Sequence, residues 1–171
     1  MKVEITRYKS GERKGEIKKC DVQVEYGDDW NADWTIATMV LPLLKKVKEL
    51  KQGAPFVDDA HVPEHLRSTS APPKENDWDT DDNWFKRWDY VLHEILFAMQ
   101  EIANDNENEP PYHTKVGTME FGEVDKKTNT GPVIFEGWES TPESKAANKA
   151  YHDRIQNGCV LFGTYFTSLW T

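Results

Sequence analysis

Two short segments near the start of the chain alternate between apolar and polar residues. Val3 and Ile5 fall on one face of the first segment, and residues 21–26 alternate along their whole length. Strict alternation is typical of a strand with one buried face, because successive side chains of a strand point to opposite sides. Gly11 and Gly15 lie between the two segments and favour a turn, so the pattern predicts a β-hairpin.

A second pair of short segments lies in the last third of the chain. Residues 115–124 and 132–138 flank the polar run 126–131, which ends in glycine. Short apolar segments on either side of such a run are typical of a hairpin. We expect the two hairpins to form one antiparallel sheet.

Three longer segments carry apolar residues at the three- and four-residue spacing of a helix. They cover residues 34–51, 81–104 and 141–170. The third begins with a capping-box pattern, in which Ser140 and Glu143 satisfy amide groups of the first turn. The sequence therefore predicts three main helices packed against one face of the sheet.

The third predicted helix is long for a chain of this size. At 1.5 Å per residue it would span roughly 40 Å, which exceeds the width of a small core. Its last turns also carry four aromatic residues, Phe162, Tyr165, Phe166 and Trp170. Such an end covers a whole sheet or docks on another subunit, and we expect a homo-oligomer formed through this helix.

Residues 52–83 lack any periodicity and contain four prolines. One short turn of helix fits between Pro63 and Arg67. Irregular connections longer than about 15 residues are uncommon in compact domains, and many of them are functional. We expect a single α+β domain over residues 1–171, with 52–83 as a long irregular surface loop.

The overall composition is that of a globular protein with a polar, solvated surface. Of the 171 residues, 37% are hydrophobic, 12% aromatic and 30% charged, which excludes disorder of the whole chain. No apolar run approaches the roughly 18 residues of a membrane helix, and no signal-peptide pattern begins the chain. We expect a cytoplasmic protein without a membrane segment.

The net charge of −9 is concentrated in the middle of the chain. Residues 58–143 carry 7 basic and 20 acidic residues, whereas the flanking segments are slightly basic. Phosphate backbones repel such a chain, so general nucleic-acid binding is disfavoured. An acidic segment of this kind can also imitate DNA phosphates and occupy a DNA-binding protein.

One group of residues in the predicted loop has the side chains of a divalent-metal site. Asp58, Asp59 and His61 offer carboxylate and imidazole ligands. The run matches neither a calcium loop nor a zinc helix, so a solvated loop whose aspartates cap turns is the favoured explanation and the metal site is the alternative. No other cofactor is expected. Cys20 and Cys159 provide neither a disulfide framework nor a metal-binding CxxC motif.

A second group suits a nucleotide-like ligand. Indole rings stack on bases and basic side chains meet phosphates, and the candidates are Trp78, Trp84, Arg67, Lys86 and Arg87. The alternative is that Trp84 belongs to the core. No Ser/His/Asp, Cys/His or phosphate-loop motif accompanies these residues, so an enzyme is the less favoured reading.

Several long strings resemble a family of uncharacterised tailed-bacteriophage proteins. They are GAPFVDD at 53–59, VPEHLRSTSAPPKEN at 62–76, FKRWDYVL at 85–92 and RIQNG at 154–158. The resemblance covers about residues 30–100 and 150–171 and brings no known activity. It implies a viral protein that acts in the host bacterial cytoplasm during infection, or a minor virion component.

Three functions follow as hypotheses. The first is a non-enzymatic, homo-oligomeric anti-defence protein that sequesters or inhibits a host factor, either a host protein or a small nucleotide-like ligand. The second is a metal-dependent hydrolase that uses Asp58, Asp59 and His61. The third is an acidic DNA mimic that inhibits a host DNA-binding protein.

Overall fold

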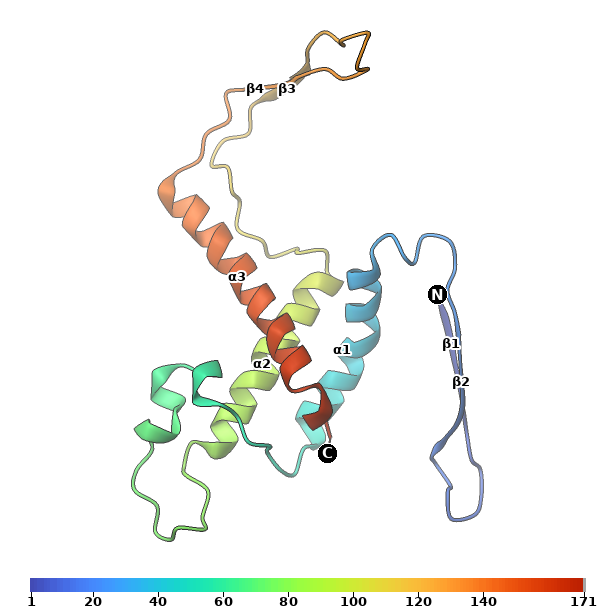
Figure 1. Ribbon diagram of the computed structural model, residues 1–171, viewed down its shortest axis with the longest axis vertical. Helices are drawn as coiled ribbons and strands as arrows, with labels where there is room; N and C mark the ends of the chain where they lie inside the picture. Colours follow the sequence, from blue (N-terminus) through green and yellow to red (C-terminus); the bar gives the residue numbers. More distant parts are fainter. Residues whose placement is uncertain (171) are drawn as a thin grey trace.

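The computed structural model describes residues 1–170 and has an α+β fold (Figure 1). Three long helices form the body, and two antiparallel hairpins extend from it, so the predicted fold class is confirmed. The helices are α1 (Ala32–Leu50), α2 (Trp84–Ala103) and α3 (Pro142–Thr164), and the strands are β1 (Lys2–Arg7), β2 (Ile17–Gln23), β3 (Thr118–Phe121) and β4 (Val133–Glu136).

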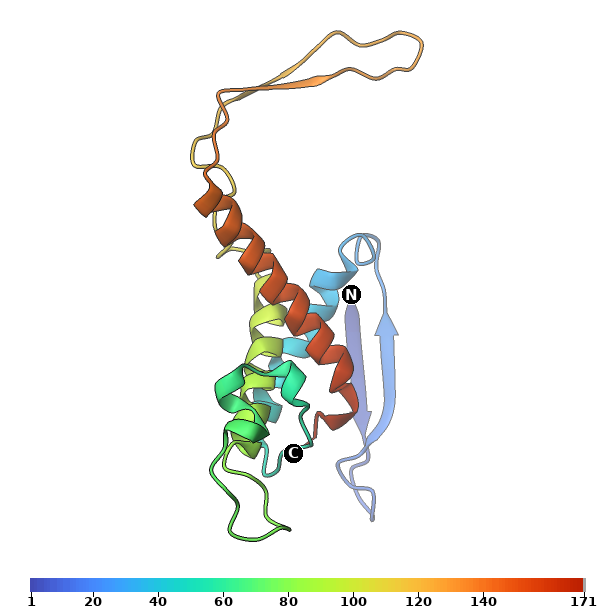
Figure 2. The same cartoon turned by 60° about the vertical axis from the view of Figure 1, so that its left-hand side comes forward.

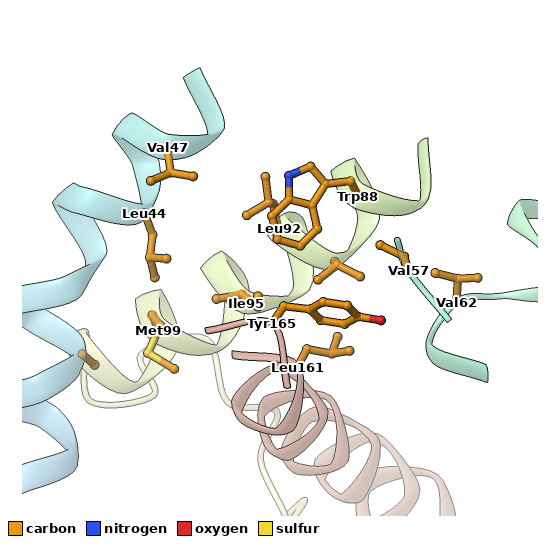
Figure 3. Packing of buried hydrophobic residues seen from close by; sticks show 12 residues of the cluster. Leu44, Val47, Val57, Val62, Trp88, Leu92, Ile95, Met99, Leu161 and Tyr165 are labelled. Carbon is orange, nitrogen blue, oxygen red and sulfur yellow. The ribbon is translucent and has the colours of Figure 1, made fainter. Parts of the chain in front are cut away.

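Helix α2 is the centre of the body, and α1 and α3 pack against two of its sides. Val91, Leu92 and Ile95 of this helix are fully buried. Figure 3 shows Leu92 and Ile95 between Leu44 and Val47 of α1 and Leu161 of α3. The helices therefore bury their apolar stripes against one another, at roughly 25 cal/mol per Å² of apolar surface.

The hairpins do not join in one sheet, which corrects the expected arrangement. Among the described residues, β1 pairs with β2 and β3 pairs with β4, and the two pairs form separate two-stranded sheets. Figures 1 and 2 show one hairpin beside α1 and the other beyond the start of α3. The helices complete the core without a sheet, so the strands are left outside it.

The connection between α1 and α2, residues 51–83, is irregular as predicted, and we call it the strap. It contains three 3₁₀ turns, Asp59–His61, Glu64–Leu66 and Ser68–Ser70. The second of these is the short turn expected after Pro63. Val57 and Val62 enter the core, so the first half of the strap is packed against the helices.

Helix α3 begins and ends differently from the prediction. Its capping box is Thr141 with Ser144, whose side chains exchange hydrogen bonds with each other's backbone N–H at 3.1 Å. The Ser140–Glu143 pair was therefore wrong by one residue. The helix stops at Thr164 because Tyr165 turns into the core against Trp88, with ring centroids 5.8 Å apart.

Helices α2 and α3 approach each other most closely at Gly158. A Cβ at this position would lie 2.5 Å from the Ala98 Cβ and 2.5 Å from the Glu94 carbonyl oxygen. Any larger side chain would push the two helices apart. The close crossing therefore depends on glycine here, whereas Gly163 on the same helix faces open space.

We expect Gly158→Ala to lower the free energy of unfolding by about 1 to 3 kcal/mol, because the added methyl group overpacks the crossing. Urea denaturation followed by circular dichroism measures this change. Gly163→Ala is the matched control, and it should be neutral or stabilising by up to about 1 kcal/mol, since alanine favours a helix more than glycine does. Equal effects of the two substitutions would contradict the close packing at Gly158.

Candidate functional site

A buried ion pair joins the strap to the first turns of α2. Arg87, only 2% exposed, donates from its two terminal nitrogens to both carboxylate oxygens of Asp81, at 2.9 and 2.7 Å. The guanidinium also donates to the carbonyl oxygen of Leu66 at 3.3 Å. These hydrogen bonds hold the pKa of Asp81 below its ordinary value. Arg87 therefore has a structural partner where the sequence suggested a phosphate ligand.

The three proposed metal ligands lie in the first half of the strap, and each engages another group. Asp58 accepts from the backbone N–H of Ala60 at 2.8 Å. Asp59 accepts from the backbone N–H and the hydroxyl of Ser68, and these bonds lower its pKa. Within residues 1–170, no group of three histidine, cysteine or acidic side chains is arranged to hold a metal ion. The metal site stays a prediction.

His61 contacts the end of α3 instead of the two aspartates. Its Nδ1 lies 2.8 Å from the Tyr165 hydroxyl, which also accepts from the backbone N–H of Asp58 at 3.1 Å. Burial raises the pKa of Tyr165, so the phenol stays protonated. Figure 3 shows this ring pointing its hydroxyl toward the part of the strap that carries Val57 and Val62. The phenol fastens the strap to α3.

A pocket of about 590 Å³ lies where the second half of the strap meets α2. Trp78 and Trp84 both line it, so the structure brings together two of the residues predicted to bind a ligand. Trp84 is partly buried and its indole N–H donates to the carbonyl oxygen of Ala54 at 3.1 Å. Lys74, whose ammonium donates to the carbonyl oxygen of Asp77 at 2.9 Å, shares the lining with Asp79 and with Asp81, so the pocket carries no excess of positive charge for a phosphate.

The two remaining predicted ligand residues lie outside this pocket's lining. Arg67 is exposed, and its carbonyl oxygen accepts from the side-chain amide of Asn83 at 3.3 Å. The Lys86 ammonium donates to the carbonyl oxygen of that same amide side chain at 3.1 Å. Stacking of a ligand on the two indoles stays a prediction, and the charge of the pocket favours a neutral or cationic ligand over a phosphorylated one.

Sequence reasoning missed two further buried charges on α2. Glu94 accepts two hydrogen bonds of 2.8 Å from Arg154 of α3, and Glu101 accepts one of 2.7 Å from the Tyr151 hydroxyl. Burial has the largest single effect and raises the pKa of Glu94, but the hydrogen bonds and charges of Arg154 and His93 together lower this pKa below its ordinary value. Charged residues recur every seven positions, at 87, 94 and 101, within the apolar stripe of α2. This spacing could have indicated the buried charges from the sequence alone.

The first hairpin has one apolar face, and it is uncovered. The register pairs Val3 with Val22 and Ile5 with Cys20, so these four side chains share a face. Every residue of β1 is exposed, and Ile5 retains 50% of its accessible surface. We call this hairpin, residues 1–26, the first arm.

The second hairpin repeats this arrangement. Met119 pairs with Phe135 and Phe121 with Val133, which places four apolar side chains on one face. All residues of β3 and β4 are exposed, and Phe121 reaches 76%. We call residues 113–139 the second arm. Two-stranded hairpins are marginally stable in water, so both arms need a surface to cover their apolar faces.

Helix α1 also has an uncovered apolar stripe. It is formed by Ile36, Met39, Leu43 and Leu50, and Leu43 is 65% exposed. Beside this stripe lies an apolar groove of about 100 Å³ between α1 and the end of α3, lined in part by Val40, Leu43, Phe162 and Phe166. The exposed aromatic residues at the end of α3 thus belong to the same surface as the α1 stripe.

Comparisons with protein-family models, with curated proteins and with solved structures find no match for this chain. The resemblance to tailed-bacteriophage proteins therefore stays a prediction. Across residues 1–170, the helices are too short or too polar to cross a bilayer.

We expect Asp81→Asn to lower the free energy of unfolding by about 3 kcal/mol at neutral pH, because it leaves the buried Arg87 charge without its carboxylate. The stabilisation by this carboxylate exists above the ordinary aspartate pKa of about 4 and is lost as the pH falls through the lowered pKa of the folded state. Urea denaturation at a series of pH values measures the difference from wild type, which should shrink below about pH 4.

Asp82→Asn is the control for this prediction, since Asp82 is the exposed neighbour of Asp81. It should change the free energy of unfolding by no more than about 0.5 kcal/mol. A loss for Asp81→Asn that stayed constant down to low pH would show that the carboxylate charge does not carry the stabilisation.

Proposed function

We propose that the protein is a non-enzymatic binding protein that works as a homo-oligomer, with its two arms as the contacts between copies. The observation that carries this proposal is the uncovered apolar face on each arm. Such faces are rare on proteins that stay monomeric, because they leave hydrophobic surface in water without any gain in folding. Each arm is instead shaped to gain its stability from another molecule.

The base of the second arm supports a binding role, since it is fixed to the body. The Ser144 hydroxyl of α3 donates to the carbonyl oxygen of Tyr112 at 2.8 Å. The side-chain amide of Asn148 donates to Glu109 at 2.7 Å and to the carbonyl oxygen of Pro110 at 2.9 Å. A firm base holds the exposed strands in a defined direction, which lowers the entropy that binding costs.

The ligand of such an assembly is the second part of the proposal. In the viral setting that the sequence resemblance implies, the oligomer would bind and inhibit a host protein. The Trp78–Trp84 pocket supports a protein over a nucleotide, because its lining holds a single lysine together with Asp79 and Asp81. The exposed indole of Trp78 beside the partly buried Trp84 also suits the apolar and polar groups of a peptide.

We expect purified wild-type protein to be oligomeric, and Ile5→Glu and Phe135→Glu each to lower its mass, because a charge on either apolar face opposes docking. Sedimentation equilibrium over a wide concentration range measures this. The matched controls are Thr6→Glu and Thr118→Lys, on the opposite faces of the same hairpins, where each new charge faces an opposite one (Lys19 and Glu136), and they should keep the wild-type mass. A wild-type protein that stays monomeric at every concentration would refute the proposal.

A further inference from the structure

We propose that the Trp78–Trp84 pocket and an acidic pocket beside it together bind an arginine-containing segment of the partner protein. This inference rests on the second part of the proposed function, the binding of another protein, and deepens it by naming the chemistry that the site recognises. Three observations carry it: two pockets that share a wall, an indole ring that is left in water, and carboxylates that no basic side chain neutralises.

The Trp78–Trp84 pocket shares part of its lining with a second pocket of about 400 Å³. The residues common to both linings are Pro73, Lys74, Asp79 and Thr80. The second lining adds the carboxylates of Glu75 and Asp82. One ligand can therefore lie against the indoles of the first pocket and reach the carboxylates of the second.

Trp78 provides the free aromatic ring of this site. Its side chain is 84% exposed, although indole is a large and mainly apolar group. Trp84 is different, because the Phe56 ring lies 6.1 Å and the Arg87 guanidinium 5.8 Å from its own ring. Trp84 thus belongs to the fixed part of the pocket. An indole face is the strongest aromatic partner for a cation, so Trp78 offers a place for a positively charged group.

The two linings together are acidic. They hold one basic side chain, Lys74, and four acidic ones, Glu75, Asp79, Asp81 and Asp82. Arg87 neutralises Asp81, which leaves three carboxylates. Across residues 1–170, the ion pairs involve none of these three. The site therefore has unpaired negative charge.

The nearby polar groups do not supply the missing positive charge. Lys74 directs its ammonium to the carbonyl oxygen of Asp77, and Asp79 accepts a hydrogen bond of 2.9 Å from the neutral side-chain amide of Asn76. Arg67 and Lys86, the basic residues that we expected beside the indoles, line neither pocket. A cation from another molecule would complement the charge of the site.

Arginine is the side chain that suits both pockets at once. Its guanidinium is planar, so it stacks on an indole face, and its N–H groups fork onto carboxylate oxygens. Its apolar stem can pack on Trp78 and Pro73 while the charged head reaches Asp79 in the shared wall. Lysine carries a compact and strongly hydrated charge, which stacks less well. Arginine is therefore the preferred residue.

The exposure of Trp78 favours a protein segment over a small free cation. Sites for small molecules usually bury most of the ligand surface, whereas this ring lies open to water. Tryptophan is enriched among the residues that dominate protein interfaces. The wall formed by Pro72 and Pro73 extends the apolar surface beside the ring, so residues next to the arginine can pack there.

Both ends of the loop that forms the pockets are fixed to the body. Before the loop, the Ser70 hydroxyl donates to the carbonyl oxygen of Glu64 at 2.7 Å. After it, the Asn83 side-chain amide donates to the carbonyl oxygens of His65 and Arg67, both at 3.3 Å. Fixed ends reduce the entropy that ordering of the loop would cost on binding.

The test follows the indole N–H signal of Trp78 by NMR while a peptide is added. The probe is an acetylated and amidated peptide with one arginine between proline and alanine residues. The signal is assigned by its absence from Trp78→Phe. We expect a saturable shift. The same peptide with citrulline, which keeps the shape of arginine and lacks its charge, should bind about fivefold more weakly or worse.

Two substitutions of matched charge locate the contact. Asp79→Asn should weaken binding of the arginine peptide about fivefold or more, because it removes the carboxylate of the shared wall. Asp77→Asn is the control, since Asp77 lies on the same loop and lines neither pocket, and it should bind as wild type does. Both positions are exposed, so both variants should fold normally.

Several results would overturn the inference. Equal binding of the arginine and citrulline peptides would remove the role of charge, and equal weakening by the two substitutions would remove the role of the pocket. Free arginine amide that bound as tightly as the peptide would indicate a site for a small cation. A shift of the Trp78 signal on concentrating the protein alone would indicate a second copy in the site.

These results are independent of the arms. A protein that is monomeric by sedimentation equilibrium and binds the arginine peptide would refute the homo-oligomer and support this inference. An oligomeric protein that leaves the peptide unbound would support the arms as contacts between copies and refute this inference.

Discussion

The burial of three charged side chains along α2 is the constraint on which the rest of the structure depends. Arg87, Glu94 and Glu101 lie on one line of this helix, and desolvation of an ionised group costs several kcal/mol unless a partner replaces the water. The partners come from separate segments, since Asp81 belongs to the strap and Arg154 and Tyr151 belong to α3. Folding of α2 into the core is therefore possible only when both segments are in register. Specific pairing thus fixes the packing that hydrophobic burial alone would leave loosely determined.

The packing of the helical body explains why the strands lie outside the core. Once α1, α3 and the strap enclose α2, the apolar surface of α2 is used, and this central helix offers no face for a sheet to cover. The hairpins then keep their apolar faces, formed by residues such as Ile5 and Phe121, in water. Their sequences nevertheless retain the alternation of half-buried strands. Alternation is typical of a strand with one buried face, yet both faces of each hairpin are exposed here. A surface of another molecule would cover the apolar faces. For this reason we propose that the arms carry the function.

The sequence predicted the individual helices and hairpins well, but it predicted less well how these elements pack together. The apolar spacing located α1 within two residues of each end, and the turn residues located both hairpins. The expectation of a single sheet was wrong, because alternation shows that a strand face is covered and carries no information on what covers it. The end of α3 was wrong because Tyr165 continues the helical pattern, and only its contacts with Trp88 and the strap turn it inward. Of the predicted ligand residues, Trp78 and Trp84 meet at one pocket. The partner of Arg87, Asp81, fell at the start of the predicted helix 81–104, whereas the structure places it in the strap before Trp84, so the helical pattern did not indicate the pair.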